Sequence, residues 1–238
     1  MLADKILTSS QTGVHFEAVR AQCAVAAKVY TGVLQLVSLL NGVSAQALLR
    51  TLFETIVGAV ILAKHPEKLD DFGKHGKLTL LRMAQSIDES SAFAKKQMTE
   101  TLKNVAKAER DDLADYFKPT YNWHMLRSKA AFDEAELTKN FHESFYARAS
   151  AIAHGEPFTV FQHKDPEAKT WKIEPRCEEW SKWPMIAYVM SMLLMLHMVG
   201  HVSKVFGLGL EDELAVVGAE VGALAGKQMQ SAKDLPDV

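Results

Sequence analysis

The chain has 238 residues and, with 27 Lys and Arg against 29 Asp and Glu, a formal net charge of −2 at pH 7. A chain of this length can form one domain, residues 1–238, with a large core. The near balance of charge excludes a strong overall attraction to nucleic acid or to an anionic membrane. Cys23 and Cys177 form no metal-ligand spacing, and the first residues lack the pattern of a secretion signal. We therefore expect a cytoplasmic protein.

Apolar periodicity predicts an all-α helical bundle, in which residues 1–64 form a helical hairpin. The stretch TSSQ (residues 8–11) is a capping-box pattern, and the periodicity follows it from residue 14 to residue 40. Asn41-Gly42 then breaks the pattern. Ser44 is placed to cap a second helix, which should end before Pro66 because the residue before a proline is disfavoured in a helix.

The middle of the chain predicts charged helices over residues 66–117 and two further helices over residues 120–155. Gly73 and Gly76 should interrupt the first charged helix. The last of these helices should end at Gly155, since a left-handed glycine commonly closes a helix.

The periodicity changes over residues 156–178. FTVFQ and TWKIE alternate like strands around the turn-rich HKDPEAK, which predicts a small β-hairpin or ordered loop near residues 158–175. Residues 181–230 then predict an apolar helix followed by a C-terminal helix. The apolar run 183–206 is about as long as a membrane span. We expect it to be a core helix or a dimer interface instead, because the other apolar helices alternate with charged residues.

Polar residues interrupt two of these helices at helical spacing. Arg50 and Glu54 lie four positions apart in an otherwise apolar stretch, where charges normally require partners. Tyr146, Ser150 and His154 also follow one another at intervals of four, so they share one stripe of a helix. We expect the two sets to meet in a buried polar network.

These residues also carry a resemblance. RTLFE (residues 50–54), NWHM around Trp123, and YARASAIAHG (residues 146–155) together resemble an uncharacterised bacterial domain-of-unknown-function family, DUF5677. That family has an R-x-x-x-E helix followed by a Y-x-x-x-S-x-x-x-H helix, and the similarity extends over roughly residues 30–160. The resemblance implies an all-helical intracellular fold and no known activity, and it adds Trp123 to the candidate site.

A second similarity concerns Arg148 and His154, which fit the R-x(4-6)-H pattern of HEPN ribonucleases. Those are helical dimers that cleave RNA without a metal. The resemblance implies that His154 transfers a proton and that Arg148 stabilises the charged phosphorane. Ala149 departs from the polar residue usual at its position, and a spacing of six turns Arg148 about 120° away from His154 on a regular helix.

Two functional hypotheses remain open at this point. In the first, the protein is an intracellular interaction or sensing protein, and its polar network fixes helix packing or binds an unknown protein or small molecule. In the second, the protein is a HEPN-type ribonuclease in a toxin or phage-defence role, with RNA as its substrate. Neither hypothesis requires a cofactor, and the sequence does not decide whether the protein is an enzyme.

His197 and His201 have the i,i+4 spacing that can bind zinc, but no third ligand is evident. We therefore expect a helix interface there and no metal site. The expected partner is a second copy of the chain, bound through apolar helical surface, and membrane association is not expected.

Overall fold

The structure is a computed structural model that describes residues 2–39, 41–86, 107–118, 123–126, 128–137, 146–154 and 178–233. Within these ranges it is all-α and contains no strand, which confirms the predicted fold class. The predicted β-hairpin near residues 158–175 lies outside the described residues. The elements are α1 (Leu2–Leu7), α2 (Val14–Ser38), α3 (Gly42–Lys64), the 3₁₀ turn η1 (Pro66–Lys68), α4 (Leu69–Ser86), α6 (Lys107–Phe117), α7 (Ser128–Glu134), α8 (Ala147–Ala153), α10 (Glu178–Phe206) and α11 (Glu211–Lys233).

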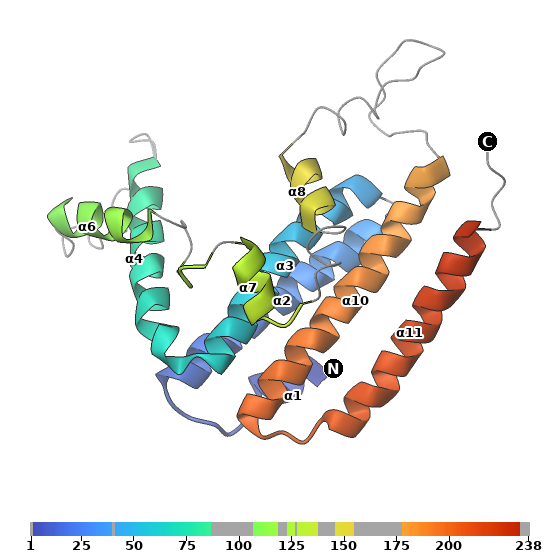
Figure 1. Ribbon diagram of the computed structural model, residues 1–238, viewed down its shortest axis with the longest axis horizontal. Coiled ribbons are helices and arrows are strands. Elements are labelled where there is room, and N and C mark those ends of the chain that lie inside the picture. The colour runs from blue at the N-terminus through green and yellow to red at the C-terminus, as the bar shows by residue number, and fades with distance from the viewer. Residues whose placement is uncertain are drawn as a thin grey trace, which may run out of the picture.

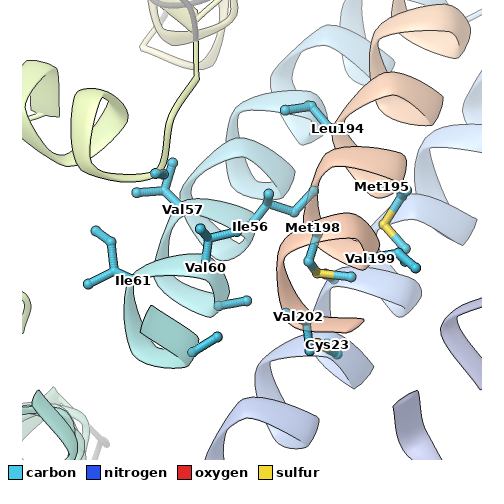
Figure 2. Packing of buried hydrophobic residues seen from close by; sticks show 14 of the residues in the cluster. Cys23, Ile56, Val57, Val60, Ile61, Leu194, Met195, Met198, Val199 and Val202 are labelled. Carbon is cyan, nitrogen blue, oxygen red and sulfur yellow. The ribbon is translucent and has the colours of Figure 1, made fainter. Parts of the chain in front are cut away.

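Helix α3 lies at the centre of the bundle. It packs against α2 and α10 along its length, and the short helices α7 and α8 lie over it (Figure 1). Every residue from Ile56 to Ala63 is buried. Figure 2 shows Ile56 of α3 beside Leu194 and Met198 of α10. Fully burying an aliphatic side chain of this size contributes about 1.5–3 kcal/mol, so this contact is a main source of stability.

The core also holds Cys23 of α2, which Figure 2 shows beside Val202 of α10. The cysteine is fully buried and forms no disulfide. Burial raises the pKa of the Cys23 thiol to about 12, so it stays protonated. It therefore packs as a small apolar group.

Helices α2 and α3 follow each other in the chain and pack together, and their caps differ from the predicted ones. Asn41, and not Ser44, caps α3: its side chain accepts a hydrogen bond from the Ser44 backbone N–H at 3.1 Å. TSSQ does not cap α2, whose N-cap is Gly13. Instead, the Thr8 hydroxyl donates a hydrogen bond to the Asp4 carbonyl at 2.8 Å, and the Gln11 side-chain amide donates one to the Phe206 carbonyl at 3.1 Å. The two side chains of the capping-box pattern therefore bond to other parts of the chain.

Helices α4 and α6 project from one end of the bundle and pack on each other (Figure 1). Helix α4 runs unbroken through Gly73 and Gly76, so the predicted interruption is wrong. No neighbouring atom would approach a Cβ at either glycine. An exposed glycine costs a helix only about 1 kcal/mol, which lowers its stability without ending it.

The apolar helix of the prediction is α10, and it begins at Glu178, three residues before the expected start. It ends at Phe206, followed by Gly207 with φ 63°. Among the described residues, α3 and residues Pro184–Phe206 are long and apolar enough to cross a membrane, with 67% and 50% of their most apolar windows buried in the protein. Core helices of globular proteins share these properties, and other helices surround α3.

Candidate functional site

Four polar side chains converge where α8 lies over the first half of α3. Arg50 Nε donates a hydrogen bond to Glu54 Oε1 at 3.0 Å, and the Tyr146 hydroxyl donates to the same oxygen at 2.9 Å. The guanidinium of Arg50 also contacts Nε2 of His154. We call Arg50, Glu54, Tyr146 and His154 the α8 cluster.

The contact between Arg50 and His154 has a fixed direction. A guanidinium has only donors, so Nε2 of His154 is the acceptor in this contact. The Arg50 guanidinium therefore lies between a carboxylate of its own helix and an imidazole about a hundred positions later in the chain.

Aromatic packing positions Tyr146. Its ring lies edge-on to Phe53 of α3, with centroids 6.0 Å apart, and 4.9 Å from the ring of Phe132 in α7. Burial and the negative charge of Glu54 raise the pKa of Tyr146 above its usual value. The phenol therefore keeps its proton and acts as a hydrogen-bond donor to Glu54.

The α8 cluster opens to solvent, in contrast to the buried network expected from the sequence. The Arg50 side chain is 23% exposed and that of Glu54 is 48% exposed. His154 is also exposed. The reason is the position of Glu54 on the side of α3 that faces away from the core, next to the end of a helix of only seven residues.

The other candidates from the sequence occupy different positions. Ser150 is half-buried on α8, and its carbonyl accepts the His154 backbone N–H at 3.0 Å. Trp123 lies elsewhere, against Gly58 of α3 and 5.2 Å from the ring of Phe72. The backbone of Arg148 belongs to α8, but its side chain is outside the described part of the structure.

His197 and His201 of α10 face the end of α7. Nε2 of His197 lies 2.7 Å from the carbonyl oxygen of Ala135, so it must carry a hydrogen and donate it. His201 Nε2 lies 3.7 Å from a carboxylate oxygen of Glu136. Burial is the main cause that lowers the pKa of both histidines. Within the described residues, no group of three or more His, Cys, Asp or Glu is arranged to hold a metal.

A second set of charges, which the sequence did not predict, surrounds these histidines. Lys64 Nζ donates to the carbonyl oxygen of Glu134 at 2.7 Å and to Glu136 Oε1 at 3.0 Å. His65 Nε2 lies 2.8 Å from Glu134 Oε1. We call this set the α7 cluster, and its members are Lys64, His65, Glu134, Glu136, His197 and His201. The three sequence segments that supply these residues, 64–65, 134–136 and 197–201, have no shared spacing, so only their meeting in space identifies the cluster.

Comparison with known proteins gives one result. The model of a family of unknown function, DUF5677, matches residues 17–169. A comparison with curated proteins finds no match, and a comparison with solved structures finds none. The matched range contains all four residues of the α8 cluster and ends before α10. Because the match covers more than half of the chain, the protein belongs to the DUF5677 family, whose function is unknown.

Proposed function

We propose that this protein is an intracellular helical interaction or sensing protein whose α8 cluster binds a small ligand through a carboxylate or phosphate group. The observation that carries the proposal is the Arg50 guanidinium, held by Glu54 and in contact with His154 while 23% of its side chain stays exposed. A guanidinium has five N–H donors in a planar fork that matches carboxylate and phosphate oxygens.

The energetics support binding over a purely structural role. An exposed i,i+4 ion pair such as Arg50–Glu54 contributes only about 0.3–0.5 kcal/mol. The aromatic contacts of Tyr146 with Phe53 and Phe132 already hold α8 on α3. The polar groups are therefore not needed to fix the packing of these helices, and they are open to a ligand.

Each group has a distinct role in this proposal. Glu54 orients the guanidinium, because its Oε1 accepts a hydrogen bond from Arg50 Nε, and Tyr146 holds that oxygen by donating a second hydrogen bond to it. Arg50 supplies the fixed positive charge. His154 adds an imidazole at the exposed end of α8, in contact with the guanidinium.

A thermal-shift screen of the full chain against carboxylates and phosphates tests the proposal. We expect a ligand that raises the wild-type melting temperature but not that of Arg50→Ala, with a reduced effect in Arg50→Lys, which keeps the charge and loses the fork. Lys5→Ala is the matched control, because it removes an exposed ion pair with Glu213 far from the site. If no anion shifts the melting temperature and Arg50→Ala is itself strongly destabilised, the cluster is a packing device.

A second candidate function, metal-independent RNA cleavage, has one observation in its favour. An imidazole and a guanidinium lie in contact at an exposed position, and these are the groups needed to move a proton and to stabilise a phosphorane. In this reaction the 2′-oxygen attacks phosphorus after losing its proton, and the 5′-oxygen leaves with a proton. Here Arg50, and not only Arg148, is a candidate for the stabilising cation.

Incubation of wild-type protein with mixed RNA in chelator tests this alternative. Cleavage that His154→Ala abolishes at an unchanged melting temperature would support it, and comparing Arg50→Ala with Arg148→Ala would identify the cation. Absence of cleavage by pure wild-type protein would reject it.

The cytoplasmic location also remains a proposal, in which α3 and α10 are core helices and not membrane spans. Its support is the close packing of α3 against α2, α7, α8 and α10. Recovery of the wild-type chain in the detergent-free soluble fraction of cells would agree with this proposal. Recovery only in detergent-extracted membranes would contradict it.

A further inference from the structure

Helix α7 contributes to one cluster directly and contacts the other. Figure 1 shows α7 and α8 placed one after the other over α3. The end of α7 supplies Glu134, whose carboxylate meets Nε2 of His65 at 2.8 Å. Two positions earlier, the ring of the buried Phe132 lies 4.9 Å from that of Tyr146, whose hydroxyl donates to Glu54. Contacting side chains therefore connect His65 in the α7 cluster with Glu54 in the α8 cluster.

The two contacts of His65 require a positively charged ring. Nδ1 lies 2.9 Å from Glu67 Oε1, and Nε2 lies 2.8 Å from Glu134 Oε1. An ionised carboxylate only accepts hydrogen bonds, so each ring nitrogen must carry a hydrogen, which is the case only in the imidazolium. After loss of one proton, one nitrogen would turn a lone pair toward a carboxylate. The link between α3 and α7 therefore depends on the charge of His65.

The charges that face His65 keep this link intact at neutral pH. Hydrogen bonds from His65 and then Lys64 lower the pKa of Glu134, so that carboxylate stays ionised. The hydrogen bond to Glu134 is in turn the main cause that raises the pKa of His65, opposed by partial burial and aided by Glu67. The nearby cations are Lys64, 3.3 Å from Glu134, and Lys68 of η1, which acts on Glu67.

The other members of the α7 cluster keep their charge state above pH 6.5. Glu136 pairs with Lys64 at 3.0 Å and lies 3.7 Å from His201. Burial is the main cause that lowers the pKa of His197 and His201, so both are neutral in this range. His65 is therefore the member of the cluster that changes charge as the pH rises above 6.5.

Helix α7 is short enough that such contacts decide its position. It has seven residues, Ser128–Glu134, and isolated helices shorter than about 12 residues are marginal in water. Its end turns through Glu136, a non-glycine residue with φ 58° that Lys64 holds. Loss of the link to His65 should therefore loosen α7 and leave the core of α2, α3 and α10 folded.

We propose that His65 is a pH-sensitive positioning residue for the α8 cluster and that its charge determines how firmly Phe132 holds Tyr146. At pH 6.5 the imidazolium binds Glu134, α7 stays in place, and Tyr146 keeps Glu54 oriented. At higher pH the link weakens and the α8 cluster loses its fixed arrangement. This inference rests on the proposed function and adds its regulation, in which the site binds anions more weakly as His65 loses its charge.

Hydrogen exchange, measured residue by residue by NMR, tests the coupling without any ligand. The amides of Ala135 and Leu137 bond to carbonyls of α7 and report on that helix. The amide of His154 bonds to the Ser150 carbonyl and reports on α8. From pH 6.5 to pH 8.5, after correction for the intrinsic exchange rate, the protection of all three amides should fall by about three- to tenfold.

Variants of the link identify His65 as the cause. His65→Gln is neutral at every pH and should show the weaker protection at both pH values. His65→Lys keeps a positive charge and should show the stronger protection at both. Comparison of each variant with wild type also subtracts any titration of His154 itself. Glu134→Ala should abolish the change with pH, whereas Asp133→Ala, at an exposed position of the same helix, is the matched control and should retain it.

Acetate is the probe for the site itself, because it is a carboxylate whose charge is constant over this range. Between pH 6.5 and pH 8.5, its dissociation constant for wild type should rise about three- to tenfold more than that for His65→Gln. An equal change in the two proteins would overturn the proposed regulation. If wild type binds no acetate, carboxylate binding by the α8 cluster fails, whereas the coupling stands or falls with hydrogen exchange.

Two exchange results would overturn the coupling. The first is unchanged protection of Ala135 and Leu137 in wild type between the two pH values, which would show that His65 does not control α7. The second is reduced protection of these amides with unchanged protection of His154, which would show that loosening of α7 does not reach α8.

Discussion

The α7 and α8 clusters both join α3 to a short helix, but they differ in how fully their groups are paired. In the α7 cluster, Lys64 has acceptors on both Glu134 and Glu136. Both ring nitrogens of His65 lie within 2.9 Å of a carboxylate oxygen, one of Glu67 and one of Glu134. In the α8 cluster, two donors share one oxygen of Glu54, which is 48% exposed.

Position along α3 explains part of the difference. Lys64 is the last residue of α3 and His65 is its C-cap, so both cationic groups lie at the negative end of the helix dipole. Arg50 and Glu54 lie within the helix, where the dipole has no such effect. The α7 cluster is therefore the more fully paired of the two, and the exposure of the α8 cluster is what its proposed binding role requires.

The largest expected effect comes from Phe53→Ala, because Phe53 contacts aromatic residues that belong to both helices. Its buried ring lies 5.9 Å from Phe132 of α7 and 6.0 Å from Tyr146 of α8. Truncating a buried Phe should lower the free energy of unfolding by about 3–5 kcal/mol, measured by urea denaturation. Phe53→Leu, which keeps most of the volume, is the control and should cost less than half as much. Equal losses in the two variants would contradict this account.

The next largest effect is the protonation of His124, which is only 8% exposed. Burial, and then the charges of His75 and Lys68, lower its pKa from 6.5 to about 4. A lowered histidine pKa stabilises the fold above pH 6.5, and this contribution disappears as the pH falls toward 4. Relative to His124→Gln, wild type should lose about 3 kcal/mol of unfolding free energy between pH 6.5 and pH 4. A parallel pH dependence in the two proteins would show that His124 does not titrate in this range.

Glu134→Ala should break the α7 cluster, since this side chain accepts from Lys64 and His65. We expect a loss of about 1 kcal/mol in the free energy of unfolding, decreasing at high salt because the carboxylate is 38% exposed. Glu67→Ala is the control, because Glu67 is 67% exposed and contacts only His65 within the cluster. A larger effect of the control would show that Glu134 is not the anchor.

Glu134→Ala should also change how the free energy of unfolding depends on pH. The hydrogen bond to Glu134 is the main cause that raises the pKa of His65, opposed by partial burial and aided by Glu67. Stability from a raised histidine pKa is complete below pH 6.5 and is lost as the pH rises through the folded-state pKa. Wild-type protein should therefore lose more stability than Glu134→Ala as the pH rises above 6.5.

The smallest expected effect is that of Glu54→Ala on stability. It removes one exposed ion pair and the acceptor of Tyr146, and it should cost about 0.5–1 kcal/mol. Denaturation of Glu54→Ala beside Glu134→Ala gives the direct comparison of the two clusters. If Glu54→Ala proves the more damaging, the α8 cluster and not the α7 cluster is the structural anchor.

Local sequence was enough to predict the parts of the fold that depend on neighbouring residues. The hairpin of α2 and α3 followed from apolar periodicity broken at Asn41-Gly42. The i,i+4 spacings within α3 and α8 marked Arg50, Glu54, Tyr146 and His154 as candidates, because a helix aligns such positions on one side whatever surrounds it. Ser150 has the same spacing, but it is not a member of the α8 cluster.

The tertiary structure decided everything that depends on which surfaces meet. Exposure of the α8 cluster follows from how little of α3 a seven-residue helix covers, and no spacing encodes that. Lys64 and Glu136 are 72 positions apart, and only the packing of α7 brings them within 3.0 Å. Gln11 of the predicted capping box similarly donates to the carbonyl of Phe206, 195 positions later, and Gly13 is the N-cap of α2. A helix's own periodicity determines which residues share a face, but the partner that covers the face comes from distant parts of the chain.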